Sequence, residues 1–187
     1  MKKYIQSYAY LVVIAGLIII LDQWTKALVR TNIPFGGYWS PWPWLAPYAR
    51  IVNWDNTGAA FGMFQGFNGV LSILAIIVAV FIFYYYPKLS ENDWPMRIAM
   101  GLMLGGALGN FVDRIMMGRV TDFISVGSFA VFNVADSSIT IGVILLILIV
   151  WYRDRQEKKR ETSQQAVPVE ENNHNERIIQ DQGDQIE

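Results

Sequence analysis

Four stretches of this chain are apolar over about the length that a helix needs to cross a lipid bilayer. They cover residues 8–29, 68–86, 96–116 and 134–152. A hydrocarbon core of ~30 Å requires ~20 mostly apolar residues in a helix. Hydrophobic residues make up 53% of the chain and charged residues only 17%, which is typical of membrane proteins. The sequence therefore predicts an α-helical integral membrane protein with four transmembrane helices.

Lysine and arginine in the flanks predict the orientation of these helices, because cytoplasmic loops carry the excess of positive charge. The larger group lies on one side of a four-span arrangement: Lys2, Lys3, Lys88, Arg97, Arg153, Arg155, Lys158, Lys159 and Arg160. The smaller group lies on the other side: Lys26, Arg30, Arg50, Arg114 and Arg119. We therefore expect both termini in the cytoplasm and the loops 30–67 and 113–133 outside it.

The two ends of the chain carry different signals. Two lysines precede the first apolar run, as in a cleavable leader, but no small-residue cleavage site follows, so we expect a retained span. Residues 161–187 are rich in Gln, Glu, Asn and Asp, which is typical of a disordered segment. The basic cluster at 153–160 is interpreted as a topology anchor. We expect a four-span membrane domain over 1–160 and a disordered cytoplasmic tail over 161–187.

Composition excludes several kinds of catalytic site. The chain has no cysteine, and its single histidine, His174, lies in the tail, so a cysteine nucleophile and a Ser-His-Asp triad have no basis. A zinc site would need carboxylates alone, which zinc seldom accepts, and we expect no metal and no cofactor. A Ser–Lys dyad with Lys26 is conceivable, although neighbouring Thr25 cannot face it on a helix. Acid–base chemistry by carboxylates remains.

Two aspartates, Asp122 and Asp136, lie in a polar gap between two apolar stretches. A carboxylate near hydrocarbon is expensive to desolvate, so it needs a partner, a water-filled cavity or a function. Alternation around Asp122 predicts a short strand. Asp136 falls in the first turn of the last span, where helix capping alone would explain it. Capping does not explain Asp122.

Other polar residues stand at the outer ends of the spans. Asp22 and Lys26 are spaced i,i+4 in the order that favours an ion pair. Asn110 and Arg114 share a helix face, which suits a pair that clamps a peptide carbonyl or orients a carboxylate. Residues 53–58 look like a turn. The glycines at 101, 105 and 109 form a small-residue stripe that predicts close helix packing.

The loop 38–48 is dense in tryptophan, tyrosine and proline. Tryptophan and tyrosine favour the bilayer interface, and proline interrupts helices. We expect a segment on the membrane surface, followed by short strands near 50–54 and 60–64. Two interpretations stay open: a plain aromatic belt, or a platform that guides a lipid-embedded substrate.

Five motifs resemble those of bacterial lipoprotein signal peptidase, also called signal peptidase II. They are Asp22-Gln23-Trp24-Thr25-Lys26, Asn56-Thr57-Gly58-Ala59-Ala60-Phe61, Gly105-Gly106-Ala107-Leu108-Gly109-Asn110-Phe111-Val112-Asp113-Arg114, Val120-Thr121-Asp122-Phe123-Ile124 and Phe132-Asn133-Val134-Ala135-Asp136-Ser137. The resemblance covers about residues 21–139, with four spans in the same order. The segment 161–187 has no counterpart in the usual pattern.

The resemblance implies a membrane aspartic endopeptidase of the bacterial cytoplasmic (inner) membrane, active on the extracytoplasmic face beside a small β-containing platform. It implies cleavage of prolipoproteins just before a cysteine that carries diacylglycerol, with membrane lipids as further partners and no nucleic acid. It places the catalytic pair on Asp122 and Asp136. The residues it implies for substrate binding or bracing are Asp22, Lys26, Asn56, Gly58, Asn110, Asp113, Arg114 and Asn133.

Elementary chemistry agrees with such a pair. Two neighbouring carboxylates cannot both ionise cheaply, so they hold one proton between them. The ionised member takes a proton from water while the other polarises the scissile carbonyl. Two alternatives remain: a proton- or ion-coupled transporter, because intramembrane acids also mark proton paths, and a non-catalytic scaffold that docks partners on its Trp-rich loop.

Overall fold

The computed structural model describes residues 2–58, 66–90 and 92–166. Residues 1–146 form one compact unit and residues 147–187 a second one. The elements along the chain are α1 (Lys2–Asn32), β1 (Tyr38–Trp39), β2 (Ala49–Asn56), α2 (Asn68–Tyr85), the 3₁₀ helix η2 (Tyr86–Lys88), α3 (Trp94–Met117), β3 (Val120–Val126) and α4 (Val134–Ala166). The second unit contains the later part of α4, which is largely exposed.

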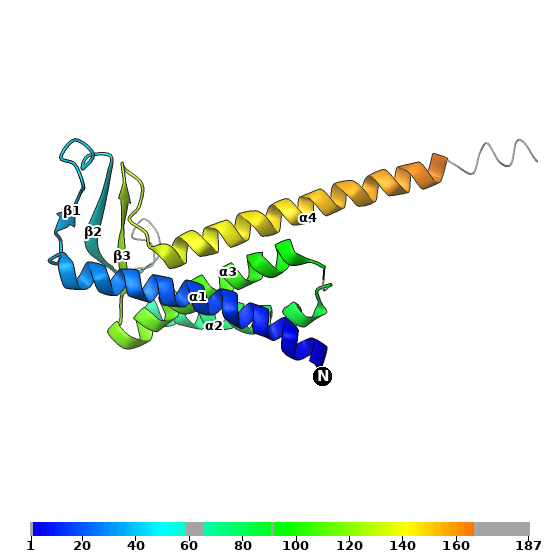
Figure 1. Ribbon diagram of the computed structural model, residues 1–187, viewed down its shortest axis with the longest axis horizontal. Helices are drawn as coiled ribbons and strands as arrows, with labels where there is room; N and C mark the ends of the chain where they lie inside the picture. The colour runs from blue at the N-terminus through cyan, green and yellow to red at the C-terminus, as the bar shows by residue number, and fades with distance from the viewer. Residues whose placement is uncertain (1, 59–65, 91, 167–187) are drawn as a thin grey trace, which may run out of the picture. The chain divides into compact units, whose positions relative to one another are not determined.

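Four helices are long and apolar enough to cross a membrane: Tyr8–Asn32, Asn68–Lys88, Trp94–Met117 and Val134–Ser163. The prediction of four spans is confirmed. The helical segments extend past the apolar stretches of the sequence, because polar residues in their terminal turns lower the local hydropathy. A small sheet accompanies the helices (Figure 1).

The last helix differs from the sequence prediction at its C-terminal end. α4 continues to Ala166, into the segment 161–187 that was expected to be disordered. Glu, Lys, Arg and Gln are good helix formers, and Lys158 Nζ lies 2.8 Å from the Asp154 carboxylate one turn earlier, in a pairing that favours a helix. The remaining tail, 167–187, lies outside the described residues, as does the strand predicted near 60–64.

α3 packs against both α1 and α2 in the first unit (Figure 1). The contact with α1 follows the predicted glycine stripe. A Cβ atom on Gly101 would lie 2.6 Å from Cγ2 of Ile14, and one on Gly105 would lie 2.7 Å from Cβ of Ile18. Larger side chains at these positions would push the two helices apart. α3 then ends at Gly118, whose φ of 69° is left-handed and suits glycine at a helix terminus.

The sheet has the order β1-β2-β3 with antiparallel pairing throughout. The predicted short strands around 50–54 and around Asp122 are confirmed as β2 and β3. Its core joins Val29, in the last turn of α1, and Ile33, just after that helix, to Phe123 of β3. In the register of β2 and β3, Trp54 stands opposite Asp122. The sheet therefore brings Asp122 to the end of α1 where Asp22 and Lys26 stand.

Candidate active site

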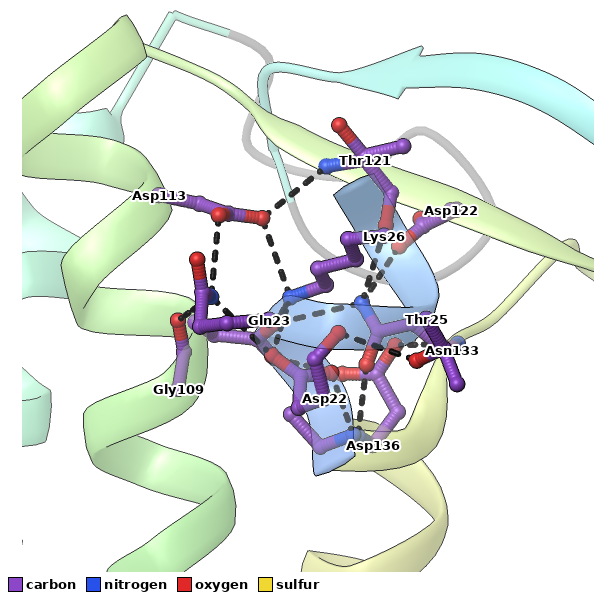
Figure 2. A network of polar contacts seen from close by, with 12 residues as sticks. Asp22, Gln23, Thr25, Lys26, Gly109, Asp113, Thr121, Asp122, Asn133 and Asp136 are labelled. Atoms are coloured by element: carbon purple, nitrogen blue, oxygen red, sulfur yellow. Dashed lines mark hydrogen bonds and ion pairs between the residues drawn. The ribbon is translucent and has the colours of Figure 1, made fainter. Parts of the chain in front are cut away.

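Polar side chains from α1, α3, β3 and the first turn of α4 meet in one network (Figure 2). Two groups of charged residues can be distinguished in it. The first, which we call the ion cluster, consists of Asp22, Lys26, Arg30 and Asp113. The second, which we call the aspartate pair, consists of Asp122 and Asp136.

The ion cluster holds charges that neutralise one another, all of them fully buried except the partly exposed Arg30. The ammonium nitrogen of Lys26 lies 2.7 Å from Oδ2 of Asp22 and 3.0 Å from Oδ2 of Asp113, and all three side chains have 0% exposure. Nη1 of Arg30 lies 3.7 Å from Oδ1 of Asp113. The predicted ion pair between Asp22 and Lys26 is confirmed. Two carboxylates and two cations balance, as buried charges require.

The ion cluster also holds neighbouring elements together. Oδ1 of Asp22 accepts a hydrogen bond from the backbone N–H of Ala135 at the start of α4, at 2.9 Å. Oδ2 of Asp113 accepts one from the backbone N–H of Thr121 in β3, at 3.3 Å. The Gln23 amide donates to both carboxylates, at 3.2 and 3.1 Å. One cluster thus connects α1, α3, β3 and α4.

The aspartate pair is held by amides rather than by cations. Oδ1 and Oδ2 of Asp122 accept hydrogen bonds from Asn133 Nδ2, at 2.7 Å, and from Asn56 Nδ2, at 2.9 Å. Oδ1 and Oδ2 of Asp136 accept them from Asn110 Nδ2, at 2.7 Å, and from the Asn133 N–H, at 3.2 Å. No lysine or arginine within 2–58, 66–90 and 92–166 forms an ion pair with either aspartate.

Asn133 and Asp136 also cap the last helix. The N–H of Asp136 donates to Oδ1 of Asn133 at 2.9 Å, and Oδ2 of Asp136 accepts from the N–H of Asn133. This reciprocal arrangement is a capping box, which satisfies free N–H groups at a helix start. The capping role that the sequence allowed for Asp136 is therefore present. It uses Oδ2 only, and Oδ1 remains directed at Asn110.

Asp122 has a strongly altered affinity for its proton. The pKa of its carboxyl is raised from 3.8 to about 7, chiefly by burial and then by repulsion from Asp136. Hydrogen bonds from Asn56 and Asn133 oppose the rise, as does the charge of Lys26. Burial disfavours the charged form and a nearby like charge does the same. A carboxyl with a pKa of about 7 can serve as an acid at neutral pH.

The guanidinium of Arg114 lies near the aspartate pair and has a buried Nε without a partner among the described residues. Its Nη2 makes one long hydrogen bond, 3.5 Å, to the carbonyl of Gly58, whose N–H donates to Oδ1 of Asn56 at 2.9 Å. Its buried Nε has no partner among the described residues, and its charge interacts with both Asp122 and Asp136. The turn predicted at Asn56 and Gly58 thus forms, and the Arg114 guanidinium lies near the pair with an Nε that bonds to none of the described residues.

Comparison with known proteins identifies the family. Residues 14–152 match the family model described as signal peptidase (SPase) II. The chain is 40% identical over 149 residues to a lipoprotein signal peptidase of Anoxybacillus flavithermus, covering 78% of this chain and 87% of that protein. It is 38% identical over 155 residues to a lipoprotein signal peptidase of Halalkalibacterium halodurans, covering 81% and 97%. The chain belongs to the signal peptidase II family.

Solved structures agree with this family. Two described as bacterial membrane enzymes, determined by the in meso method at 2.3 and 1.9 Å resolution, are each 36% identical to this chain. The first has a TM-score of 0.71 and covers 79% of this chain and 90% of its own; the second has 0.67, 75% and 91%. The prediction of an aspartic endopeptidase that cleaves lipoprotein signal peptides is confirmed at the level of the family, and a transporter is not favoured.

In this signal peptidase II, the predicted site residues all belong to one connected set of polar contacts. Asn110 joins its two halves, because Oδ1 of Asn110 accepts from Nζ of Lys26 at 2.9 Å and from Nδ2 of Asn133 at 3.1 Å. The predicted pairing of Asn110 with Arg114 is realised only in part. Asn110 orients the Asp136 carboxylate, while Arg114 bonds the Gly58 carbonyl.

The sequence analysis missed three participants in the network: Gln23, Arg30 and Thr121. Arg30 follows Lys26 by four residues, so a signal for it existed in the i,i+4 spacing along α1. Gln23 stands one residue after Asp22 within an apolar span, where a polar amide needs partners. Thr121 contributes its backbone N–H and accepts a bond from Arg30 at 3.2 Å, which no residue pattern signals.

The hydroxyl–lysine dyad that the sequence left open loses its support. Lys26 is fully buried between two carboxylates, and the Thr25 hydroxyl donates to the carbonyls of Leu21 and Asp22, so a hydroxyl–lysine dyad is not formed. Within the described residues, no group of three His, Cys, Asp or Glu side chains could hold a metal ion.

Proposed function

We propose that the aspartate pair cleaves the signal peptides of diacylglyceryl-modified prolipoproteins, immediately before the lipidated cysteine. The observation that carries this proposal is the pairing of Asp122 and Asp136 through Asn133. Amide donors hold both carboxylates, and among the described residues no cation neutralises them, so one proton can be shared between them. Membership of the signal peptidase II family supports the choice of substrate.

The two aspartates take different parts in this mechanism. Asp122 is the protonated member, because burial and its neighbour raise its pKa to about 7. Asp136 is the ionised member, since it stands in the first turn of α4, where the helix dipole favours a negative charge. Asp136 takes a proton from the attacking water while Asp122 donates a hydrogen bond to the scissile carbonyl.

The remaining residues hold the substrate or support the pair. Arg114 offers its unused guanidinium donors to substrate carbonyls, and positioning of this kind supplies much of an enzyme's rate. Asn56, Asn110 and Asn133 aim the carboxylates. Gly58 follows the end of β2, close to the two carboxylates. The ion cluster braces the helices from which these groups project.

Selection of lipidated substrates follows from depth in the bilayer. The acyl chains of the modified cysteine stay in hydrocarbon while the peptide bond reaches the aspartate pair. The loop after β1 supports this arrangement, because Trp42 and Trp44 stack with ring centroids 5.9 Å apart and are more than half exposed. Exposed tryptophans are suited to the membrane interface, where membrane lipids are their partners.

We place the enzyme in the bacterial cytoplasmic (inner) membrane, with both termini in the cytoplasm and the site on the extracytoplasmic face. The distribution of lysine and arginine supports this orientation. Because the chain has no cysteine, a single Ser40→Cys variant offers a clean test. A membrane-impermeant thiol reagent should label it in intact cells, and labelling only after lysis would reverse the orientation.

Cleavage is tested with the purified full chain in lipid vesicles. A diacylglyceryl-modified prolipoprotein should lose its signal peptide, and the same precursor without the lipid should be cleaved far more slowly. The matched control is Asp122→Asn, which keeps the shape of the site. Proton or ion flux across the vesicles without cleavage would instead support the transporter alternative.

A further inference from the structure

We propose that Lys26 is a positioning residue that holds the Asn110 amide in the one orientation in which its N–H faces Asp136. This inference rests on the proposed function and gives the ion cluster a role beyond bracing the helices. Lys26 touches neither substrate nor aspartate pair, so it acts through Asn110.

The orientation of an asparagine amide is set only by its partners. Its oxygen accepts and its nitrogen donates, but the two ends have nearly the same shape. If Asn110 turned over, its oxygen would meet the carboxylate of Asp136, to which Nδ2 now donates at 2.7 Å. The carboxylate would then lose its donor and face a second acceptor.

The contacts of Lys26 disfavour this inverted orientation of the Asn110 amide. An ammonium group has three donors and no acceptor, and each of its three close contacts is an acceptor. These are Oδ2 of Asp22 at 2.7 Å and Oδ2 of Asp113 at 3.0 Å (Figure 2), and Oδ1 of Asn110 at 2.9 Å. The two carboxylates fix the ammonium, and the remaining proton is directed at Asn110. An inverted amide would present N–H groups to a cation.

The amides of Asn56 and Asn133 are oriented in the same way, but by backbone N–H donors. Oδ1 of Asn56 accepts from the backbone N–H of Gly58 at 2.9 Å, and Oδ1 of Asn133 accepts from the backbone N–H of Asp136 at 2.9 Å. In both, the nitrogen is thereby turned toward an aspartate. Of these three amides, only Asn110 depends on a side chain for its orientation, because it stands inside α3, where backbone N–H groups are already used.

The orientation of the Asn110 amide affects both aspartates of the pair. Oδ1 of Asn110 also accepts from Nδ2 of Asn133 at 3.1 Å, and the same nitrogen donates to Oδ1 of Asp122 at 2.7 Å. An inverted Asn110 would remove an acceptor that helps to hold Asn133. Lys26 therefore influences the geometry of Asp136 through one amide and that of Asp122 through two.

A charge-balanced double variant separates this role from simple neutralisation. Lys26→Met combined with Asp22→Asn removes one positive and one negative charge, so the cluster stays balanced but loses the donor to Asn110. We expect kcat on a diacylglyceryl-modified precursor to fall about 10- to 100-fold, with KM within about threefold, because the substrate contacts remain. The matched control, Asp22→Asn alone, keeps the bond from Lys26 to Asn110 and should lose clearly less.

Recovery of kcat in the double variant to the level of Asp22→Asn would overturn the inference, since charge balance alone would then suffice. A wild-type enzyme that does not cleave the lipidated precursor would contradict the proposed function instead. If the double variant does not fold, NMR comparison of the wild-type protein with Asp136→Asn still tests whether the Asn110 amide faces Asp136. With ¹⁵N-labelled asparagine, the Asn110 side-chain resonance, assigned by its loss in Asn110→Asp, should move in Asp136→Asn; an unmoved resonance would overturn the inference.

Discussion

The molecule buries two pairs of aspartates a short distance apart and treats them in opposite ways. Asp22 and Asp113 share the ammonium of Lys26 and are fully buried. Asp122 and Asp136 share the amide side chain and backbone of Asn133. A cation in contact with both carboxylates supplies them with a counter-charge, whereas the neutral donors in contact with Asp122 and Asp136 supply none. The first pair is therefore suited to holding helices together, and the second to exchanging a proton.

The difference shows that residue type does not assign a chemical role to a buried carboxyl. Both members of the first pair and Asp136 of the second stand on long apolar helices, and each of the four carboxylates accepts at least two hydrogen bonds. The counter-charge distinguishes them. Changes that move a charge into or out of either pair should therefore break the distinction, and the following predictions are ordered by the size of the expected effect.

The largest effect is expected at the aspartate pair. Asp122→Asn and Asp136→Asn should each lower kcat by more than ~10⁴-fold, because a shared proton needs both carboxyls. The double variant should be barely worse than either single one, since the two groups act as a unit. Single-turnover cleavage of a lipidated precursor measures this. Substantial cleavage by either single variant would falsify the pairing and leave Asp136 with its capping role alone.

The next effect concerns stability and should have opposite signs in the two pairs. Lys26→Ala leaves Asp22 buried without a counter-ion and Asp113 with only the more distant Arg30, and should destabilise the fold by ~3–5 kcal/mol. Asp122→Asn should instead raise the thermal unfolding midpoint in detergent. The wild-type carboxyl is the less stable group wherever it is ionised, because burial disfavours its charge.

The gain in Asp122→Asn should depend on pH. The folded pKa of Asp122 is raised from 3.8 to about 7, so the folded state binds this proton more tightly than the unfolded state does. The destabilisation by the wild-type carboxyl is absent below pH 3.8, grows as the pH rises, and is complete above about 7. A gain in the unfolding midpoint that is equal at pH 4 and pH 8 would contradict the raised pKa.

Arg114 tests whether a cation near the aspartate pair binds substrate or merely supplies charge. Arg114→Ala should lower kcat/KM about 10- to 100-fold, since charged hydrogen bonds contribute ~1.5–3 kcal/mol. Arg114→Lys should rescue it poorly, because an ammonium cannot reproduce the planar guanidinium. Full activity of the lysine variant would show that charge alone mattered.

Asn56 sharpens the view that neutral donors tune the pair. Its amide stabilises the ionised form of Asp122 and so lowers the pKa of that carboxyl. In Asn56→Ala the alkaline limb of the bell-shaped pH–rate profile should move upward by about one unit, since one unit corresponds to ~1.4 kcal/mol. The limbs belong to the pair jointly. A downward shift would exclude this role for Asn56.

The smallest effect is expected from removing the C-terminal segment, 161–187. Truncation after Arg160 removes no residue of either pair and should leave kcat/KM within about threefold of the full chain, because the removed composition cannot build a core. Membrane insertion serves as the control. A near-complete loss of cleavage with intact insertion would assign a function to the tail.

Much of this protein can be predicted from the sequence, because hydropathy and spacing are local properties. Apolar length predicts four spans, i,i+4 spacing predicts the pair of Asp22 and Lys26, and the glycine stripe predicts close packing of α3. The length of α4 beyond 160 could not be predicted, since its residues suit both a helix and a solvated tail. The motifs also indicated which residues gather at the site.

Only the tertiary structure decides how those residues are paired. The resemblance separates Asp113 from Asp122 by role, but hydropathy and spacing do not show their partners: α1 brings Lys26 to Asp113, and β2 and the turn before α4 bring Asn56 and Asn133 to Asp122. The pKa of Asp122 and the orientation of Asn110 depend on burial and on partners from other elements. The type and spacing of a residue determine which contacts and chemistry are available to it. Its neighbours in the tertiary structure determine which charge it carries.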